Sequence, residues 1–253
     1  MLKTRIIPSL LLRGDGLVKT KKFSSPTYVG DPINAIKIFN DKEVDELIFL
    51  DITATKENRE PNLKLIEEIA GECFMPLSYG GGIRSISDIE KILKIGVEKI
   101  VINSYAVENP DFIKEASLVF GSSTIVVSID YKKDIFGKNF VYSKSGTKRH
   151  KISPLDFCKI AEDMGAGEIM LNSIARDGQM QGYDINFLNT VVNNVSIPVI
   201  GCGGAGNLND IKNLVDFTNI AAVAAGSLFV FHGPHKAVLI NYPNQIELKK
   251  ILK

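Results

Sequence analysis

Short apolar runs, many of them rich in β-branched residues, recur along the chain between glycine or polar residues, as strands usually do. Most are apolar at nearly every position, which is typical of strands buried on both faces. The eight runs lie at residues 5–11, 46–52, 76–80, 98–103, 123–130, 167–173, 197–203 and 220–226.

Segments with apolar residues at helical spacing separate these runs. Strands that alternate with helices predict a parallel sheet covered by helices. An open doubly wound sheet and a closed (βα)8 barrel both fit this alternation. Six of the helical segments lie at residues 31–45, 62–72, 85–96, 109–121, 153–165 and 207–217.

An internal repeat favours the closed barrel. The stretch PLSYGGGIRSISDIEKIL at residues 76–93 is similar to PVIGCGGAGNLNDIKNLV at residues 198–215, with a shift of 122 positions. The same shift relates Glu46 to Glu168. A doubled unit of four strands can pair every strand edge by closing on itself.

The predicted fold is therefore a single α/β domain over residues 1–253, a (βα)8 TIM barrel with a two-fold internal repeat. The half-barrels span about residues 1–120 and 121–253. In such a barrel the active site lies at the carboxyl ends of the strands, which we call the mouth. The opposite end is the floor.

Each half places glycines directly after a strand and before a helix. Ser85 and Asn207 are candidate N-caps, with Asp88 and Asp210 three positions further on. Glycine lets backbone amides approach an anion, and a helix N-terminus adds partial positive charge. A tight turn is the simpler explanation for any one glycine, but its recurrence in both halves favours two phosphate pockets.

The composition excludes several partners. Thirty lysines and arginines balance 29 aspartates and glutamates, so no overall field attracts nucleic acid or an acidic membrane surface. The three cysteines cannot all pair, which favours free thiols in a reducing compartment. We find neither a signal peptide nor an apolar run of ~20 residues, and expect a cytoplasmic protein.

Six stretches together resemble the cyclase subunit family of imidazole glycerol phosphate synthase, from histidine biosynthesis. The resemblance runs from Arg5 to about Phe231. FLDITA and GYD are similar to the cyclase rather than to the sister isomerase of the pathway, which shares the two-pocket barrel. The stretches are FLDITA, GGGI, INSYAVENP, VVSIDYK, SIARDGQMQGYD and CGGAG.

The resemblance implies that a partner glutaminase makes ammonia, which crosses the barrel and attacks a substrate with two phosphates. It implies no cofactor and no metal. A mobile first loop would carry Lys19, and Asp51, Asn172 and Asp177 would support the site. The implied phosphate contacts are Gly82, Asn103, Ser104, Gly204, Gly226 and Ser227.

The family also has a ring of charges at the barrel floor that gates ammonia. Four residues match it, Arg5, Glu46, Lys99 and Glu168. Each stands at the start of a strand, where a solvated end is the ordinary explanation. As a set, two cations and two anions could pair into a closed polar ring.

The mouth departs from the family. Two aspartates would act there as general acid and base, at the ends of the first and fifth barrel strands. Asp130 matches one, but Leu11 stands at the other position and cannot transfer a proton. Losing such a group costs about a hundredfold to ten-thousandfold in rate. Asp15 could replace it only by a shift of register, which the ungapped match of Lys19 argues against.

Two further segments differ from the family. The stretch SKSGTKRHKIS at residues 143–153 is more basic, and Thr27 stands near the place of a family arginine. His232 and His235 form an H-x-x-H pair without a third ligand, so a surface turn or a partner contact explains them better than a metal.

Three functions remain open. The first is an ammonia-conducting barrel with weak or no cyclase activity that works with a glutaminase at its floor and a sugar amidotransferase at its mouth. It resembles the second-copy paralogues associated with sugar amidation in surface polysaccharides. The second is a genuine cyclase of histidine biosynthesis, a lyase that forms imidazole glycerol phosphate. The third is a binding or structural barrel.

Overall fold

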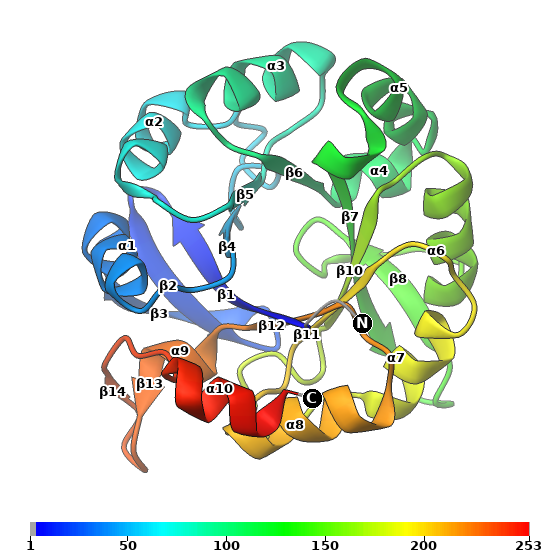
Figure 1. The fold of residues 1–253 in the computed structure, drawn as a ribbon. Helices are drawn as coiled ribbons and strands as arrows, with labels where there is room; N and C mark the ends of the chain where they lie inside the picture. The colour runs from blue at the N-terminus through cyan, green and yellow to red at the C-terminus, as the bar shows by residue number, and fades with distance from the viewer. Residues whose placement is uncertain (1–3, 253) are drawn as a thin grey trace.

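The computed structural model describes residues 4–252 and shows eight parallel strands closed into one barrel, with helices around it (Figure 1). Closure is direct, because Arg5 of the first strand pairs with Ala222 of the last. The predicted (βα)8 barrel is confirmed. Its strands are β1 (Arg5–Arg13), β4 (Leu47–Asp51), β5 (Leu77–Gly80), β6 (Lys99–Ile102), β7 (Ile125–Lys133), β10 (Glu168–Ser173), β11 (Val199–Cys202) and β12 (Ala222–Ala225).

The helices pack on the outer face of the barrel. Each of the six helical segments expected from the sequence contains one. The α-helices are α1 (Pro32–Asp41), α2 (Leu63–Glu72), α3 (Ile86–Ile95), α4 (Ser104–Glu108), α5 (Asp111–Phe120), α6 (Pro154–Asp163), α7 (Ile185–Val192), α8 (Leu208–Phe217), α9 (Ser227–Val230) and α10 (Gln245–Ile251). A 3-10 turn, η1 (Ser122–Thr124), precedes β7.

Capping residues start α3 and α8 where the sequence predicts. Ser85 and Asn207 accept the amides of Asp88 and Asp210, and each aspartate accepts the amide of its cap in return. Such capping boxes satisfy helix N–H groups that would otherwise lack a partner. The same local chemistry therefore begins the matching helix in both halves.

Alternation along the strands separates two apolar regions. In β1, Ile6, Leu10 and Leu12 pack outward against the helices, whereas Ile7 points into the barrel. The interior layer contains Ile7, Ile48, Val101, Val126, Met170, Ile200, Ala222 and Ala224, all buried. This layer lies between the floor and the mouth, because polar residues occur before and after it along the strands.

Both half-barrels extend their first strand beyond the barrel. β1 turns into the hairpin of β2 (Gly16–Lys21) and β3 (Ser24–Gly30), and β7 turns into β8 (Asn139–Ser143) and β9 (Lys148–Arg149). A further small hairpin, β13 (Phe231–His232) with β14 (Ala237–Val238), precedes α10. The two longer hairpins rise beside the mouth.

The segment expected as a first loop is thus a β-hairpin. Its pairing continues β1, with Leu11 opposite Val18 and Leu12 opposite Leu17. Gly14 makes the reversal possible with a φ of +59°, in the left-handed region that glycine tolerates. Val18 and Thr20 suit a strand because their β-branched side chains fit a half-buried sheet.

Candidate active site

The four floor charges form one closed ring of ion pairs. Arg5 binds the carboxylates of both Glu46 and Glu168. The ammonium of Lys99 lies 3.1 Å from each of the same two carboxylates. Both glutamate side chains are almost fully buried, at 3% and 7% exposed, so neither is a free solvated strand end.

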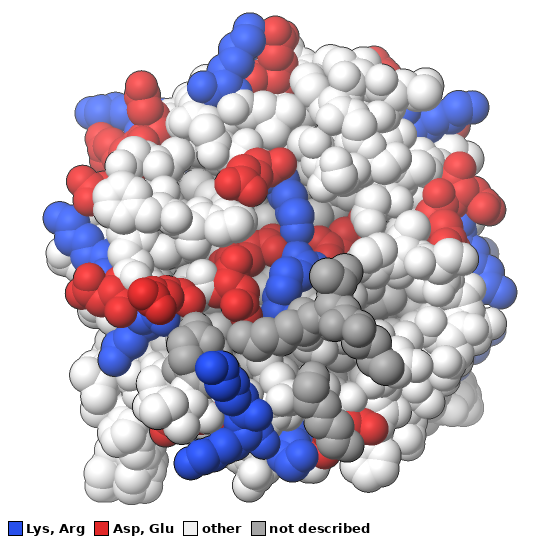
Figure 2. Space-filling model, in the orientation of Figure 1, with Lys and Arg blue, Asp and Glu red and all other residues white. Residues whose placement is uncertain are grey.

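Pairing compensates the cost of burying these carboxylates. Although burial alone would lower it, the pKa of Arg5 is raised by the charges and hydrogen bonds of Glu168 and Glu46. Ser78 adds a hydrogen bond of 2.8 Å to Glu46 from within the barrel. In Figure 2, acidic and basic side chains gather at the centre of the face viewed in Figure 1.

The mouth contains a cavity of about 590 Å³ that opens at the carboxyl ends of the strands. All six predicted phosphate contacts line it, as do Lys19, Asp51, Asn172, Asp177, Asp130 and Leu11. The structure therefore brings together the predicted phosphate contacts, the predicted supporting residues, Asp130 and Leu11 around one cavity. It places the floor ring at the other end of the barrel interior.

Asp130 is one of the buried acids that line this cavity. Burial raises its pKa to about 7, and the amides of Asn172 and Asn103 only partly oppose the shift. Asn103 also donates a hydrogen bond of 2.9 Å to the carbonyl of Ser128, which fixes its side chain beside the strand. A carboxyl that titrates near neutral pH can act as a general base or acid.

Leu11 lines the same cavity from β1. Ser9, two positions earlier on the same face of the strand, also lines it, so Leu11 points inward rather than into the outer core. The cavity thus has a carboxyl from β7 and an isobutyl group from β1. No described carboxylate from β1 reaches it.

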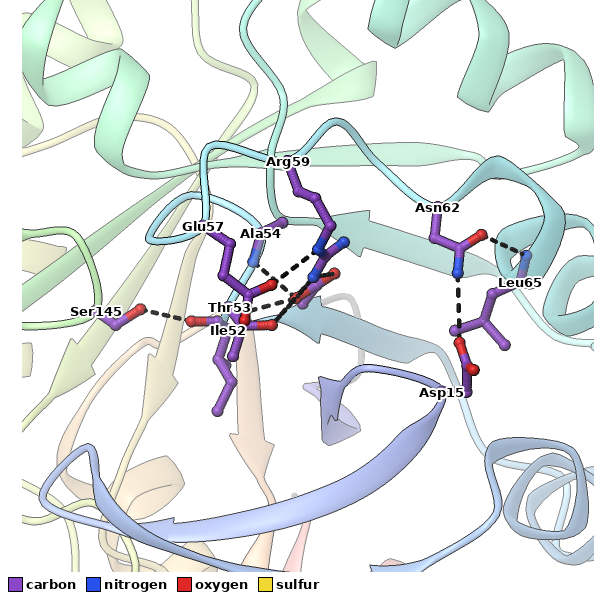
Figure 3. A network of polar contacts seen from close by, with 10 residues as sticks. Asp15, Ile52, Thr53, Ala54, Glu57, Arg59, Asn62, Leu65 and Ser145 are labelled. Carbon is purple, nitrogen blue, oxygen red and sulfur yellow. Dashed lines mark hydrogen bonds and ion pairs between the residues drawn. The ribbon is translucent and has the colours of Figure 1, made fainter.

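Asp15 does not replace that missing acid. It is exposed in the turn between β1 and β2 and accepts a hydrogen bond of 3.4 Å from Asn62 (Figure 3). It is not among the residues that line the cavity.

Lys19 comes from β2 and is fully buried at the second glycine pocket. Its ammonium donates to the carbonyl of Ser9 and lies so close to Gly226 that a Cβ there would clash with it. Burial lowers the pKa of Lys19 to about 8, although the charge of Asp177 opposes this. A cation at this place can pair with an anionic group bound at Gly226 and Ser227.

Asp177 anchors the first hairpin to the barrel. Its carboxylate accepts a hydrogen bond of 2.7 Å from the hydroxyl of Thr20 and one of 3.1 Å from the amide of Phe23. Burial is the main cause of its raised pKa. Asp177 therefore positions the strand that carries Lys19.

Asp51 ends β4 and organises the loop that follows. Its buried carboxylate accepts the amides of Thr53 and Ala54, both at 3.0 Å, and pairs with Arg59 at 3.1 Å. Figure 3 shows Arg59 reaching from the loop toward this cluster. The sequence interpretation missed Arg59, whose only signal is a basic residue in the loop after a strand-end aspartate.

The β8–β9 hairpin closes over the first glycine pocket. The amide of Lys144 donates a hydrogen bond of 2.8 Å to the hydroxyl of Ser104. The hydroxyl of Ser145 donates another, also of 2.8 Å, to the carbonyl of Ile52. Lys144 and Ser145 both line the cavity. Lys148, in the segment that is more basic than the family pattern, forms an ion pair of 2.8 Å with Glu108. Sequence reasoning did not identify these contacts because they join distant segments.

Of the remaining candidates, the two histidines of the H-x-x-H pair lie outside the cavity and one cysteine lines it. His232 is in β13, His235 is in the turn that follows, and no cluster of metal-ligating side chains occurs within residues 4–252. Cys73, Cys158 and Cys202 are free thiols, and burial raises the pKa of Cys202, which lines the mouth, to about 12. No helix within the described part of the chain is long and apolar enough to cross a membrane.

Residues 5–235 match the family of histidine biosynthesis proteins. A Pseudomonas aeruginosa chain provisionally named imidazole glycerol phosphate synthase subunit hisF2 is 54% identical, over 96% of this chain and 97% of that protein. A Vibrio vulnificus chain provisionally named subunit hisF3 is 49% identical, over 100% and 98%. Imidazole glycerol phosphate synthase subunit HisF of Petrotoga mobilis is 40% identical, over 99% and 98%. The chain therefore belongs to the histidine biosynthesis protein family, as a HisF-like chain related to the copies numbered hisF2 and hisF3.

Proposed function

We propose that this barrel receives ammonia from a glutaminase bound at its floor and conducts it to the mouth, with weak or no cyclase activity of its own. The ammonia would be used for sugar amidation in surface polysaccharide biosynthesis, by a sugar amidotransferase at the mouth. The observation that carries the proposal is the contrast between a complete charge ring and a mouth in which Leu11 faces the cavity.

Two features of the floor support the proposal that a glutaminase binds there. The ring is polar and closed, and the interior layer above it includes the small residues Ala222 and Ala224. Large apolar side chains are exposed where chain segments reach the floor end of the barrel, among them Phe74 after α2, Leu118 near the end of α5 and Phe217 at the end of α8. Exposed apolar groups of this kind favour a protein partner there.

The residues of the mouth favour weak cyclase activity rather than a complete loss of that activity. The two glycine pockets, Lys19 and Asp130 suit an anionic ligand such as the bis-phosphate that the family uses. Leu11 removes one of the two proton-transferring groups. A genuine cyclase of histidine biosynthesis is the second candidate, and the retained Asp130 with its pKa of about 7 favours it.

An activity assay separates the two candidates. The purified chain is given ammonium salt and the bis-phosphate substrate of the family, beside HisF of Petrotoga mobilis as a positive control. We expect turnover at least about a hundredfold below the control, because one general acid or base is missing. Turnover near that of the control would overturn the proposal in favour of a genuine cyclase.

A further inference from the structure

The turn between β7 and β8 holds two large apolar side chains in solvent. Ile135 is 93% exposed and Phe136 is 88% exposed, more than any other large apolar side chain of the described residues. Adjacent apolar side chains in solvent, with a polar surround, usually mark a binding surface. We call this turn, residues 134–138, the mouth tip.

Hydrogen bonds between Asp134 and the backbone stabilise the conformation of the mouth tip. The Asp134 carboxylate accepts the amides of Phe136 at 2.9 Å and Lys138 at 3.0 Å. The Asp134 amide donates 2.9 Å to the Lys138 carbonyl, and the ladder below continues through Lys133 and Asn139. A preformed tip loses little conformational entropy when it binds.

The charges around the tip are basic. Lys132, Lys133, Lys138 and Arg149 are exposed beside it, and none forms an ion pair with another described residue. Arg149 stacks over the ring of Phe140, 4.1 Å from its centroid, which holds its guanidinium in place. The one acid of the turn, Asp134, is occupied by backbone amides. This distribution is complementary to an acidic partner surface.

The tip borders a shallow groove of about 560 Å³. Its lining includes Ile135, Phe136, Tyr142 and Arg149. A side chain of a protein partner can pack in this shallow groove beside the tip, and the basic residues around it attract acidic groups on that partner. These two features argue for a protein as the occupant, and binding to lipid is an outcome that the vesicle experiment tests.

We propose that the mouth tip and its basic surround dock the protein that consumes the ammonia, through an acidic surface on that protein that carries an apolar side chain for the groove. β7 places the tip beside the exit, since Asp130 in the cavity lies on the same strand. A partner seated here sits at the rim of the mouth. That the partner uses ammonia rests on the proposed function, but the docking surface rests on the tip itself.

Site-directed photocrosslinking in cells of the source organism tests the docking. Benzoylphenylalanine replaces Phe136, or Leu118 as the matched control, which is 77% exposed near the end of α5 toward the floor. We expect one protein that forms amides with ammonia to be crosslinked at position 136 and not at position 118. Position 118 lies in the surface proposed for the glutaminase, so only crosslinks of the amide-forming protein are compared. Crosslinking at position 136 to lipid alone or to no protein, or crosslinking of that amide-forming protein equally at both positions, would overturn the docking proposal.

Binding of the captured protein, once purified, is then measured with variants of the tip. The double variant Ile135→Ser with Phe136→Ser should weaken binding at least tenfold, as should Lys132→Glu with Lys133→Glu. Raising NaCl from about 50 mM to about 300 mM should weaken binding by the wild type, because salt screens exposed charges. Unchanged binding by both double variants would overturn the proposal, as would binding of the wild type to phosphatidylglycerol vesicles that the variants lose.

Failure of the docking and failure of the proposed function give different results. If the captured protein binds the tip but never incorporates glutamine-derived ammonia, the surface stands and the proposed function fails. If it incorporates that ammonia equally well with tip variants that bind unchanged, the function stands and the docking fails.

Discussion

At the floor of the barrel each buried glutamate of the ring has two cationic partners, whereas at the mouth the buried carboxyl of Asp130 has amide neighbours. Glu46 and Glu168 are each shared between Arg5 and Lys99, so their charges are compensated within the ring. Burial instead raises the pKa of Asp130 to about 7. The same burial therefore has opposite consequences at the two ends, because the floor carboxylates have cationic partners and the Asp130 carboxyl has none among the described ion pairs.

Leu11 adds to the difference between the floor and the mouth. A second carboxyl opposite Asp130 would make the mouth a pair of proton-transferring groups. With leucine there, Asp130 and Lys19 are two buried groups of the mouth whose pKa values lie near neutral pH, at about 7 and about 8. The mouth thus has the two glycine pockets and Asp130, and Leu11 stands where the resemblance implies a second acid.

Restoring that carboxyl should have the largest effect. We expect Leu11→Asp to raise ammonium-dependent turnover of the bis-phosphate substrate about a hundredfold over the wild type. Leu11→Asn is the matched control, since it has similar polarity but no proton to transfer. Equal rates for the aspartate and asparagine variants would show that the mouth no longer fits this substrate.

The protonation of Asp130 should make the stability of the wild type depend on pH. Between about pH 3.9, the ordinary aspartate pKa in the unfolded chain, and about pH 7, the folded state binds more protons at Asp130 than the unfolded state. The wild type therefore loses stability as pH rises through this window.

Asp130→Asn should abolish that loss. The free energy of unfolding of the variant, relative to the wild type, should increase by about 3 kcal/mol from pH 5 to pH 8. Urea unfolding at both pH values measures it, with the exposed Asp15→Asn as the control variant. A difference that stays constant with pH would mean that Asp130 is ionised throughout.

Breaking the floor ring should affect delivery of ammonia rather than chemistry. Lys99→Glu would place three acids around Arg5 and disturb the closed ring. In the complex with the glutaminase and the ammonia-consuming protein, we expect glutamine-driven product to fall about tenfold, or about 1.4 kcal/mol. Product driven by ammonium salt should not change.

The control for this variant is Lys94→Glu, which reverses an exposed charge paired only with Glu90 across one helical turn. Isotope from the glutamine amide, measured in product and in free ammonium, follows the transfer. Unaffected transfer with Lys99→Glu would count against passage through the floor.

The smallest effect should come from Ser78, which supports the ring without belonging to it. Ser78→Ala removes one hydrogen bond to Glu46, whose carboxylate keeps Arg5 and Lys99. We expect a loss of about 1 kcal/mol in unfolding free energy, measured by thermal and urea unfolding. Ser87→Ala, on an exposed position of α3, is the comparison variant. A loss of several kcal/mol would mean that the ring depends on this hydroxyl.

Local patterns in the amino-acid sequence are enough to predict the elements and much of the site. Apolar runs and helical periodicity are local patterns, and so are the capping boxes of Ser85 and Asn207. The internal repeat then selected the closed barrel, and the order of residues along each strand assigned Arg5 to the floor and Asp130 to the mouth. These inferences succeed because alternation and strand direction fix which end and face a residue occupies.

Which of these groups contact one another depends on the folded barrel. The sharing of two glutamates between Arg5 and Lys99, the contact of Lys19 with Ser9 and the pKa of Asp130 depend on burial and on neighbours from distant strands. The first hairpin escaped sequence reasoning because its strands are stabilised by pairing with β1. Arg59 and the β8–β9 contacts were missed because loop conformation sets them. The order of residues along the chain thus places a carboxyl at the mouth, and its burial in the folded barrel raises its pKa to about 7.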